Sequence, residues 1–251
     1  MLHGSSVHRS ARRLRGFVLL LVVILVLSGG AALVWRIFFF EPPHVALPPP
    51  SDLPKVESPE DSQLLFFPMD DSLISAGYKN KQYLADQGYQ HYAIDLWAPG
   101  SSSVLSCGNG VVLGTEFCDN SLGNIAVIQY DNVYIPQTRE IVSLVARYYH
   151  MSEIFIGKGD VITAGQAIGT IVGSHQWYNH VHIELDTDVL HPFNTPQVAE
   201  ASSELLQRYP ADGSSILDPF SVLVLSDGQR ASLPQNITWG TEADLPRYVH
   251  G

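Results

Sequence analysis

Histidine and carboxylate side chains alternate with apolar side chains in two short segments of the chain. In HYAIDL, His91 and Asp95 lie on one side of the pattern, with the small Ala93 between them. In HVHIEL, His180 and His182 lie on one side and aliphatic residues lie on the other. Because successive side chains of a β-strand point to opposite faces, each segment predicts a strand with one apolar face and one face of potential metal ligands.

These residue types can hold a metal ion. Imidazole and carboxylate groups are the ligands that zinc uses where thiolates are absent, and three such ligands leave one coordination position open for catalysis. The pattern offers His91, Asp95 and one of His180 and His182 as ligands, while the remaining histidine is available for proton transfer. His150, which ends the run RYYH, is a further candidate. The spacing does not choose between His180 and His182.

Two other pairs of residues each allow two interpretations. Glu184 and Asp186 either orient the imidazole rings from behind or lie on a solvated strand face. Cys107 and Cys118 either form a disulfide in an oxidising compartment or remain two thiols. Because the chain has only two cysteines, it is not a disulfide-stabilised scaffold and has no zinc site made of four thiolates.

The elements that must position these residues are short apolar runs separated by Gly, Asn, Asp and Pro. The runs are rich in β-branched and aromatic residues, which predicts strands. They lie at 91–97, 110–117, 124–130, 141–150, 159–173 and 180–186. Their spacing predicts an all-β domain over residues 63–225, built as an antiparallel sheet or β-sandwich. Thr195–Gln207 is the best candidate for a short C-terminal helix, and residues 226–251 are expected to be a polar tail.

The N-terminal part of the chain has a different composition. From Phe17 to Trp35 the chain contains no charged residue, and a helix of that length would span about 28 Å, close to the thickness of a bilayer core. Four arginines precede this segment, which predicts that the N-terminus is cytoplasmic. We therefore expect a basic cytoplasmic segment (1–16), a transmembrane anchor (17–40) and a Pro-rich linker (41–62), with the β domain outside the cytoplasm. A cleaved signal peptide, which would secrete the domain, is the alternative.

The charge distribution excludes one class of partner. The chain has 14 Lys+Arg against 25 Asp+Glu, a net charge of −11. Residues 1–40 contain five arginines and no acid, so the remainder carries a net charge of −16. Nucleic-acid binding requires clustered Lys and Arg on the binding surface, so no nucleic-acid partner is expected.

Taken in order, these segments resemble the lysostaphin-type (LytM-like) zinc metallopeptidases, which cut peptide cross-bridges in bacterial peptidoglycan. The family's HxGxD element resembles HYAID, its tyrosine-x-histidine element resembles YYH, and its closing HxH element resembles HVH. A run punctuated by glycine, from Gly159 to Gly173, and the Gly123-Asn124 pair also resemble family elements. Ala93 stands where the family usually has glycine.

The resemblance implies an antiparallel β fold of the duplicated hybrid motif type with a groove across the sheet. It implies that His91, Asp95 and His182 bind Zn²⁺, and that His150 and His180 are catalytic histidines that do not bind the metal. The expected function is that of a zinc endopeptidase, held at the cell membrane by its N-terminal helix, that hydrolyses cross-links between peptidoglycan peptide stems. The sequence identifies no protein partner.

Two other functions fit parts of the same pattern. A non-catalytic member of the family would bind the cell wall or activate another wall hydrolase. A lipoyl- or biotinyl-type carrier domain has similar glycine punctuation, but it needs a modified lysine. Lys158 is the only lysine near that run and lacks methionine neighbours.

Overall fold

A computed structural model describes the part of the chain that contains the predicted β domain. The described residues are 55–70, 72–98, 100–119, 121–172, 180–196, 203–208, 213–227, 229 and 237–238. The predicted cytoplasmic segment, the anchor and most of the linker lie outside them. Among the residues described, no helix has the length and apolar character needed to cross a membrane.

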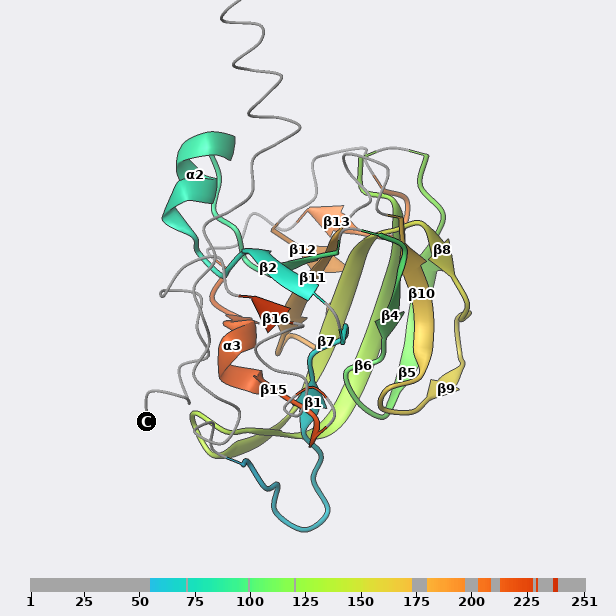
Figure 1. Cartoon of the computed structure of the whole chain (residues 1–251). Coiled ribbons are helices and arrows are strands. Elements are labelled where there is room, and N and C mark those ends of the chain that lie inside the picture. Colours follow the sequence, from blue (N-terminus) through green and yellow to red (C-terminus); the bar gives the residue numbers. More distant parts are fainter. Residues whose placement is uncertain are drawn as a thin grey trace, which may run out of the picture. The chain divides into compact units, whose positions relative to one another are not determined.

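The largest sheet has nine strands and is mostly antiparallel (Figure 1). Its path runs β16-β2-β3-β11-β7-β6-β5-β9, and β14 pairs with β11. The strands are β2 (Ser72–Ala76), β3 (Ile94–Trp97), β5 (Gly110–Glu116), β6 (Asn124–Ile135), β7 (Glu140–Met151), β9 (Val161–Ile162), β11 (His180–Asp186), β14 (Ile216–Leu217) and β16 (Ile237–Thr238). The long hairpin of β6 and β7 forms the middle of this sheet, and β11 lies directly beside β7.

Smaller sheets and two short helices complete the described part. β4 (Ser102–Leu105), β10 (Ala167–Ile171) and β8 (Glu153–Ile154) form a three-stranded antiparallel sheet. The remaining elements are β1 (Leu65–Phe66), β12 (Asn194–Thr195), β13 (Gln207–Arg208), β15 (Leu223–Val224), α2 (Lys81–Gln87) and α3 (Pro219–Val222). The pairs β1-β15, β12-β13 and β16-β2 are parallel, so the predicted antiparallel arrangement has short exceptions at its margins.

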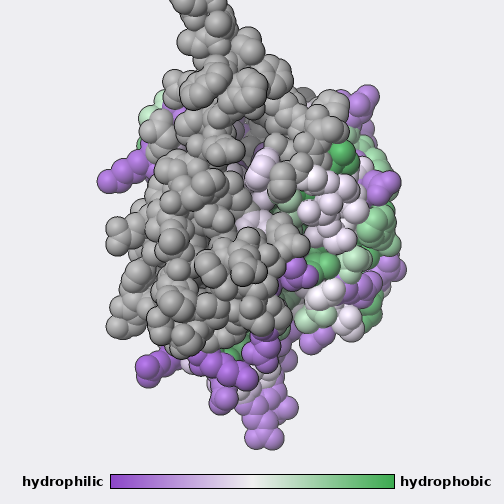
Figure 2. All heavy atoms as spheres, viewed as in Figure 1, coloured by the Kyte–Doolittle hydropathy of each residue, from purple (hydrophilic) through white to green (hydrophobic). Residues whose placement is uncertain are grey.

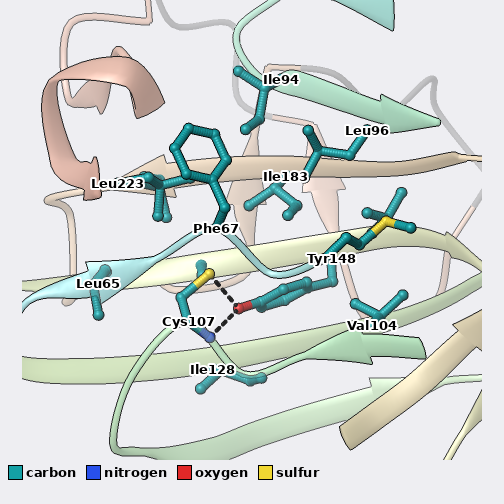
Figure 3. Close-up of a cluster of buried hydrophobic side chains, with 14 of the residues drawn as sticks. Leu65, Phe67, Ile94, Leu96, Val104, Cys107, Ile128, Tyr148, Ile183 and Leu223 are labelled. Atoms are coloured by element: carbon teal, nitrogen blue, oxygen red, sulfur yellow. Dashed lines mark hydrogen bonds between the residues drawn. The ribbon is translucent and has the colours of Figure 1, made fainter. Parts of the chain in front are cut away.

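The apolar faces of the site strands pack into the main core, as the alternation predicts (Figure 3). Ile94 and Leu96 of β3 and Ile183 of β11 are fully buried there, beside Tyr148 of β7. The Tyr148 hydroxyl donates a hydrogen bond to Cys107 Sγ over 3.0 Å. Burying these side chains removes apolar surface from water on one face of the large sheet and leaves the other face for the polar residues.

The opposite face of β6 and β7 carries a second, smaller cluster. It contains Ile125 and Val127 of β6, Val145 and Tyr149 of β7, and Leu206 from the segment between β12 and β13. Tyr148 and Tyr149 are neighbours in sequence but belong to different clusters, as period-2 alternation requires. The polar face of β11 therefore lies beside a second packed layer.

The helix predicted for Thr195–Gln207 is wrong at both ends. Thr195 belongs to β12 and Gln207 belongs to β13, and these strands pair in parallel. The Glu116 side chain explains part of the difference, because its carboxylate accepts hydrogen bonds from the backbone N–H groups of Glu204 and Leu205. These tertiary contacts override the helix propensity of the segment. Residues 197–202 lie outside the described residues.

The two cysteines are free thiols, so the disulfide alternative is not realised. Cys107 is buried in the main core, whereas Cys118 packs against the second cluster.

On the face shown in Figure 2, hydrophobic and hydrophilic residues are interspersed over the surface of the described part. The exposed large apolar residues of the described part include Val111, Phe155 and Val161.

Candidate metal centre

Strand pairing brings Asp95 and His182 together. β3 and β11 are antiparallel neighbours, and in their register Asp95 is the direct partner of His182. His182 Nδ1 lies 2.9 Å from Asp95 Oδ1. Both residues are buried, with 6% and 5% of their surface exposed.

His91 completes the cluster from just before β3. Its backbone C=O accepts a hydrogen bond from the Lys79 N–H, and its Nδ1 donates to the Gly77 carbonyl over 2.9 Å. Because Nδ1 carries the proton in that bond, Nε2 has a free lone pair. This Nε2 lies 3.1 Å from His182 Nδ1 and 3.2 Å from Asp95 Oδ1.

The three converging atoms fit a zinc ion. Potential ligand atoms of His91, Asp95 and His182 all lie within 4.8 Å of one another. Zinc bonds of about 2.0–2.2 Å in tetrahedral geometry separate neighbouring ligand atoms by about 3.3–3.5 Å. The observed separations of 2.9, 3.1 and 3.2 Å are close to those of such a site. A tetrahedral ion held by three protein atoms would keep one position open.

A β-bulge turns His150 toward this cluster. Between the Asn124–Met151 and Ala126–Tyr148 pairs, β7 has one residue more than β6. His150 lies in the bulge with a φ of 64°, in the left-handed region that few non-glycine residues occupy. Regular alternation would place its side chain in the main core with Tyr148. Instead, its ring centroid lies 5.9 Å from that of His182.

His180 lies between His150 and the carboxylate. Its ring centroid is 4.6 Å from that of His150, and its Nε2 is 4.0 Å from Asp95 Oδ1. The His180 side chain is 18% exposed, against 0% for His91 and 7% for His182. The structure thus brings together all five residues that the sequence singled out, with His180 more open to solvent than the three that converge.

The pKa shifts in the site favour a charged Asp95 carboxylate and neutral imidazole rings of His150 and His180. Burial opposes ionisation of Asp95, but His91, His180 and His182 outweigh it and hold the pKa of this carboxyl well below its usual range. Burial and the neighbouring His180 lower the pKa of His150 well below its ordinary value. Burial, opposed in part by Asp95, also lowers the pKa of His180. Asp95 is therefore an anionic ligand candidate, and His150 and His180 are neutral at pH 7 and able to accept a proton.

The residues behind His182 are buried rather than solvated. Glu184 is 0% exposed and Asp186 is 3% exposed, so the solvated-face interpretation is wrong for both. Arg147 of β7, which sequence reasoning missed, forms ion pairs with both carboxylates at 3.2 and 2.8 Å. A single arginine within the apolar run LVARYY was the available signal, because a charge in a buried strand needs a partner.

Comparison with known proteins identifies the fold around this cluster. Residues 89–194 match the family model described as peptidase family M23. This region of the chain is similar to the M23 peptidases. The matched range includes all five clustered residues, and the predicted resemblance to lysostaphin-type peptidases is confirmed. The M23 match favours a peptidase over a carrier domain.

Individual relatives cover only parts of the chain. A stretch of 96 residues is 32% identical to the peptidoglycan DD-endopeptidase ShyA of Vibrio cholerae. This stretch covers 38% of this chain and 20% of ShyA. The chain therefore spans about a fifth of the length of this relative. A zinc-containing peptidase from Vibrio cholerae is 24% identical and has a TM-score of 0.39, covering 49% of this chain and 37% of that chain. The catalytic domain of a mutant of the protein EnpA from Enterococcus faecalis is 26% identical and has a TM-score of 0.37, covering 55% and 88%.

Proposed function

We propose that this protein is a membrane-anchored zinc endopeptidase that hydrolyses peptide cross-links of bacterial peptidoglycan. The observation that carries the proposal is the convergence of His91 Nε2, Asp95 Oδ1 and His182 Nδ1 at 2.9–3.2 Å, with two further histidines beside them. The similarity to a peptidoglycan DD-endopeptidase supports the substrate class. The uncharged segment from Phe17 to Trp35 and the preceding arginines support the anchor and its orientation.

Each residue has a defined task in this proposal. His91, Asp95 and His182 hold the zinc ion, which when bound acts as a Lewis acid toward a peptide carbonyl and lowers the pKa of a water molecule. His180 and His150 take a proton from the attacking water and return one to the leaving amine. Because the His180 side chain is partly exposed, a substrate can reach its imidazole from the solvent. Burial of His150 lowers the pKa of its imidazole and thereby favours the neutral form before the proton transfer.

The experiment is zinc analysis combined with digestion of purified cell walls, using the full-length chain in detergent. The wild type should contain about one zinc ion per chain and release peptide fragments. His182→Ala should lose both properties. His191→Ala is the matched control, because His191 is an exposed histidine whose ring contacts Asp188 on the surface. The proposal fails if the wild type binds no zinc. Zinc binding without wall digestion would instead support the non-catalytic alternative.

The orientation requires a separate measurement. Protease added outside spheroplasts that express the chain should degrade the β domain and leave a protected fragment that contains the anchor. Full protection of the domain would contradict the proposed orientation. Recovery of the domain in the culture medium would favour signal cleavage over anchoring.

A further inference from the structure

Glu184 lies directly behind the imidazole ring of His182. The two residues occupy alternate positions of β11 and therefore face the same side of the sheet. Glu184 Oε1 is 3.7 Å from His182 Nε2, while His182 Nδ1 faces His91 and Asp95. The imidazole thus lies between the candidate ligand cluster and a buried carboxylate.

Three side chains hold the Glu184 carboxylate in place. The Thr195 hydroxyl lies 2.8 and 2.9 Å from its two oxygens, and the Tyr149 hydroxyl donates to Oε2 over 3.3 Å. Arg147 Nη1 donates to Oε2 over 3.2 Å. Thr195 and Arg147 are 0% exposed and Tyr149 is 2% exposed. Burying an acid and a base together is costly unless the geometry is good, so this strand face is built around a fixed carboxylate.

A fixed carboxylate behind a metal-binding histidine has a known physical effect. Such a carboxylate typically accepts the N–H of the ring nitrogen that does not bind the metal, and it thereby sets the tautomer and the orientation of the ring. At 3.7 Å, the Glu184 oxygen is slightly too far from His182 Nε2 for a hydrogen bond, and among the described residues this buried nitrogen has no other hydrogen-bond partner. We infer that Glu184 is a positioning residue that holds His182 with Nδ1 directed toward His91 and Asp95. This inference rests on the proposed metal site. It also makes Thr195, from β12, and Tyr149, from β7, part of the structure that supports the site.

Asp186 provides a matched comparison within the same network. It lies on the same face of β11, is also buried, and also forms an ion pair with Arg147, over 2.8 Å. Its carboxylate accepts hydrogen bonds from Arg147 and from the Asp188 N–H, whereas the carboxylate that faces His182 is that of Glu184. Neutralising either acid removes one partner of Arg147, but only Glu184 lies behind the imidazole. The two effects can therefore be separated.

The test compares Glu184→Gln with Asp186→Asn in the full-length chain. Zinc affinity is measured by competition with a chromophoric chelator, and Co²⁺ is substituted to record the absorption spectrum of the metal centre. Losing the carboxylate behind a ligand typically weakens metal binding by about 10–100-fold. We expect Glu184→Gln to show such a loss and an altered Co²⁺ spectrum. Asp186→Asn should stay within about threefold of the wild type.

Other outcomes would overturn the inference. It is wrong if Glu184→Gln binds zinc like the wild type, or if Asp186→Asn loses as much affinity as Glu184→Gln. If Glu184→Gln does not fold, Thr195→Val retains both acids and Arg147, and unchanged zinc affinity in that variant contradicts the inference. A wild type that binds no zinc overturns the proposed function itself, whereas an unaffected Glu184→Gln overturns only the role of Glu184.

Discussion

The ring of Tyr83 lies against the imidazole ring of His91, with centroids 4.3 Å apart and planes inclined by 31°. Tyr83 belongs to α2, and its hydroxyl lies 3.1 Å from that of Tyr89. The backbone that leads into this helix also contacts His91, because Gly77 accepts the bond from Nδ1. The loop and helix before β3 therefore enclose the one candidate ligand that lies outside the strands.

The Tyr83 ring is expected to support metal binding through packing alone. Tyr83→Ala removes the surface against which His91 is held, so we expect zinc affinity to fall by about tenfold, as for other losses of support behind a ligand. Tyr83→Phe retains the ring and removes only a hydroxyl that contacts Tyr89, so its affinity should stay within about twofold of the wild type. Chelator competition measures both variants, and equal losses would contradict a packing role.

The backbone at His150 predicts an unusual stability difference between two variants. Both His150→Gly and His150→Ala remove the imidazole, so each should lose about 10²–10⁴-fold in the rate of wall hydrolysis. Because the residue has a φ of 64°, glycine should be more stable than alanine there by about 1 kcal/mol. Denaturant unfolding of the two proteins tests this difference. Equal stability would mean that the bulge relaxes when the imidazole is removed.

Removal of Arg147 should be among the most damaging single changes in the domain. Arg147→Met leaves Glu184 and Asp186 buried without their cation, so we expect the free energy of unfolding to fall by about 3–5 kcal/mol. Arg208→Met is the control, because Arg208 is exposed on β13 and should change stability by at most about 0.5 kcal/mol. Similar stabilities for the two variants would show that the buried acids find other partners.

Glu116 should make stability depend on pH in the acidic range. Burial alone would raise its pKa, but hydrogen bonds from Ser203 and from the N–H groups of Glu204 and Leu205 outweigh burial and lower the pKa. The folded state therefore favours the carboxylate. This stabilisation is fully present above the unfolded-state pKa of about 4.3 and is lost as the pH falls through the lower folded-state value.

The measurement for Glu116 is the free energy of unfolding between pH 6.5 and pH 3, compared with that of Glu116→Gln. The wild type should be more stable at pH 6.5, and the difference should shrink as the pH decreases. Comparing the two proteins isolates this residue from the other acids that titrate in the same range. A constant difference across the range would mean that the hydrogen bonds do not depend on the charge.

The sequence predicts the site strands well because alternation is a local property. His182 and Ile183 point to opposite faces of β11 for the same reason that their residue types alternate. The predicted runs at 124–130 and 141–150 lie within β6 and β7, but β6 continues to Ile135 and β7 begins at Glu140. Period-2 patterns carry enough information to place one face on the core and the other in the site.

The alternation of residue types along a strand does not predict features that depend on contacts between distant parts of the chain. The orientation of His150 comes from one extra residue in β7, and nothing in RYYHM indicates a left-handed residue. The strands at Thr195 and Gln207 replace a predicted helix because Glu116, far away in sequence, binds the backbone near them. α2 has no expected counterpart in the sequence interpretation. At the predicted helix, tertiary contacts decide a conformation for which the local sequence has another preference. α2 does have a local signal, because Asn80 Oδ1 accepts a hydrogen bond from the Tyr83 N–H at the start of the helix.

The pairing of Asp95 with His182 has a consequence for the time at which the site can form. The two residues are 87 positions apart, and His150 joins them from the strand on the other side of β11. No short fragment of the chain contains the whole cluster, and β3, β11 and β7 must all be paired before it exists. A newly synthesised chain would therefore lack the complete cluster until β3, β7 and β11 had all been made and paired. Formation of the candidate metal site would therefore depend on completion of this part of the sheet.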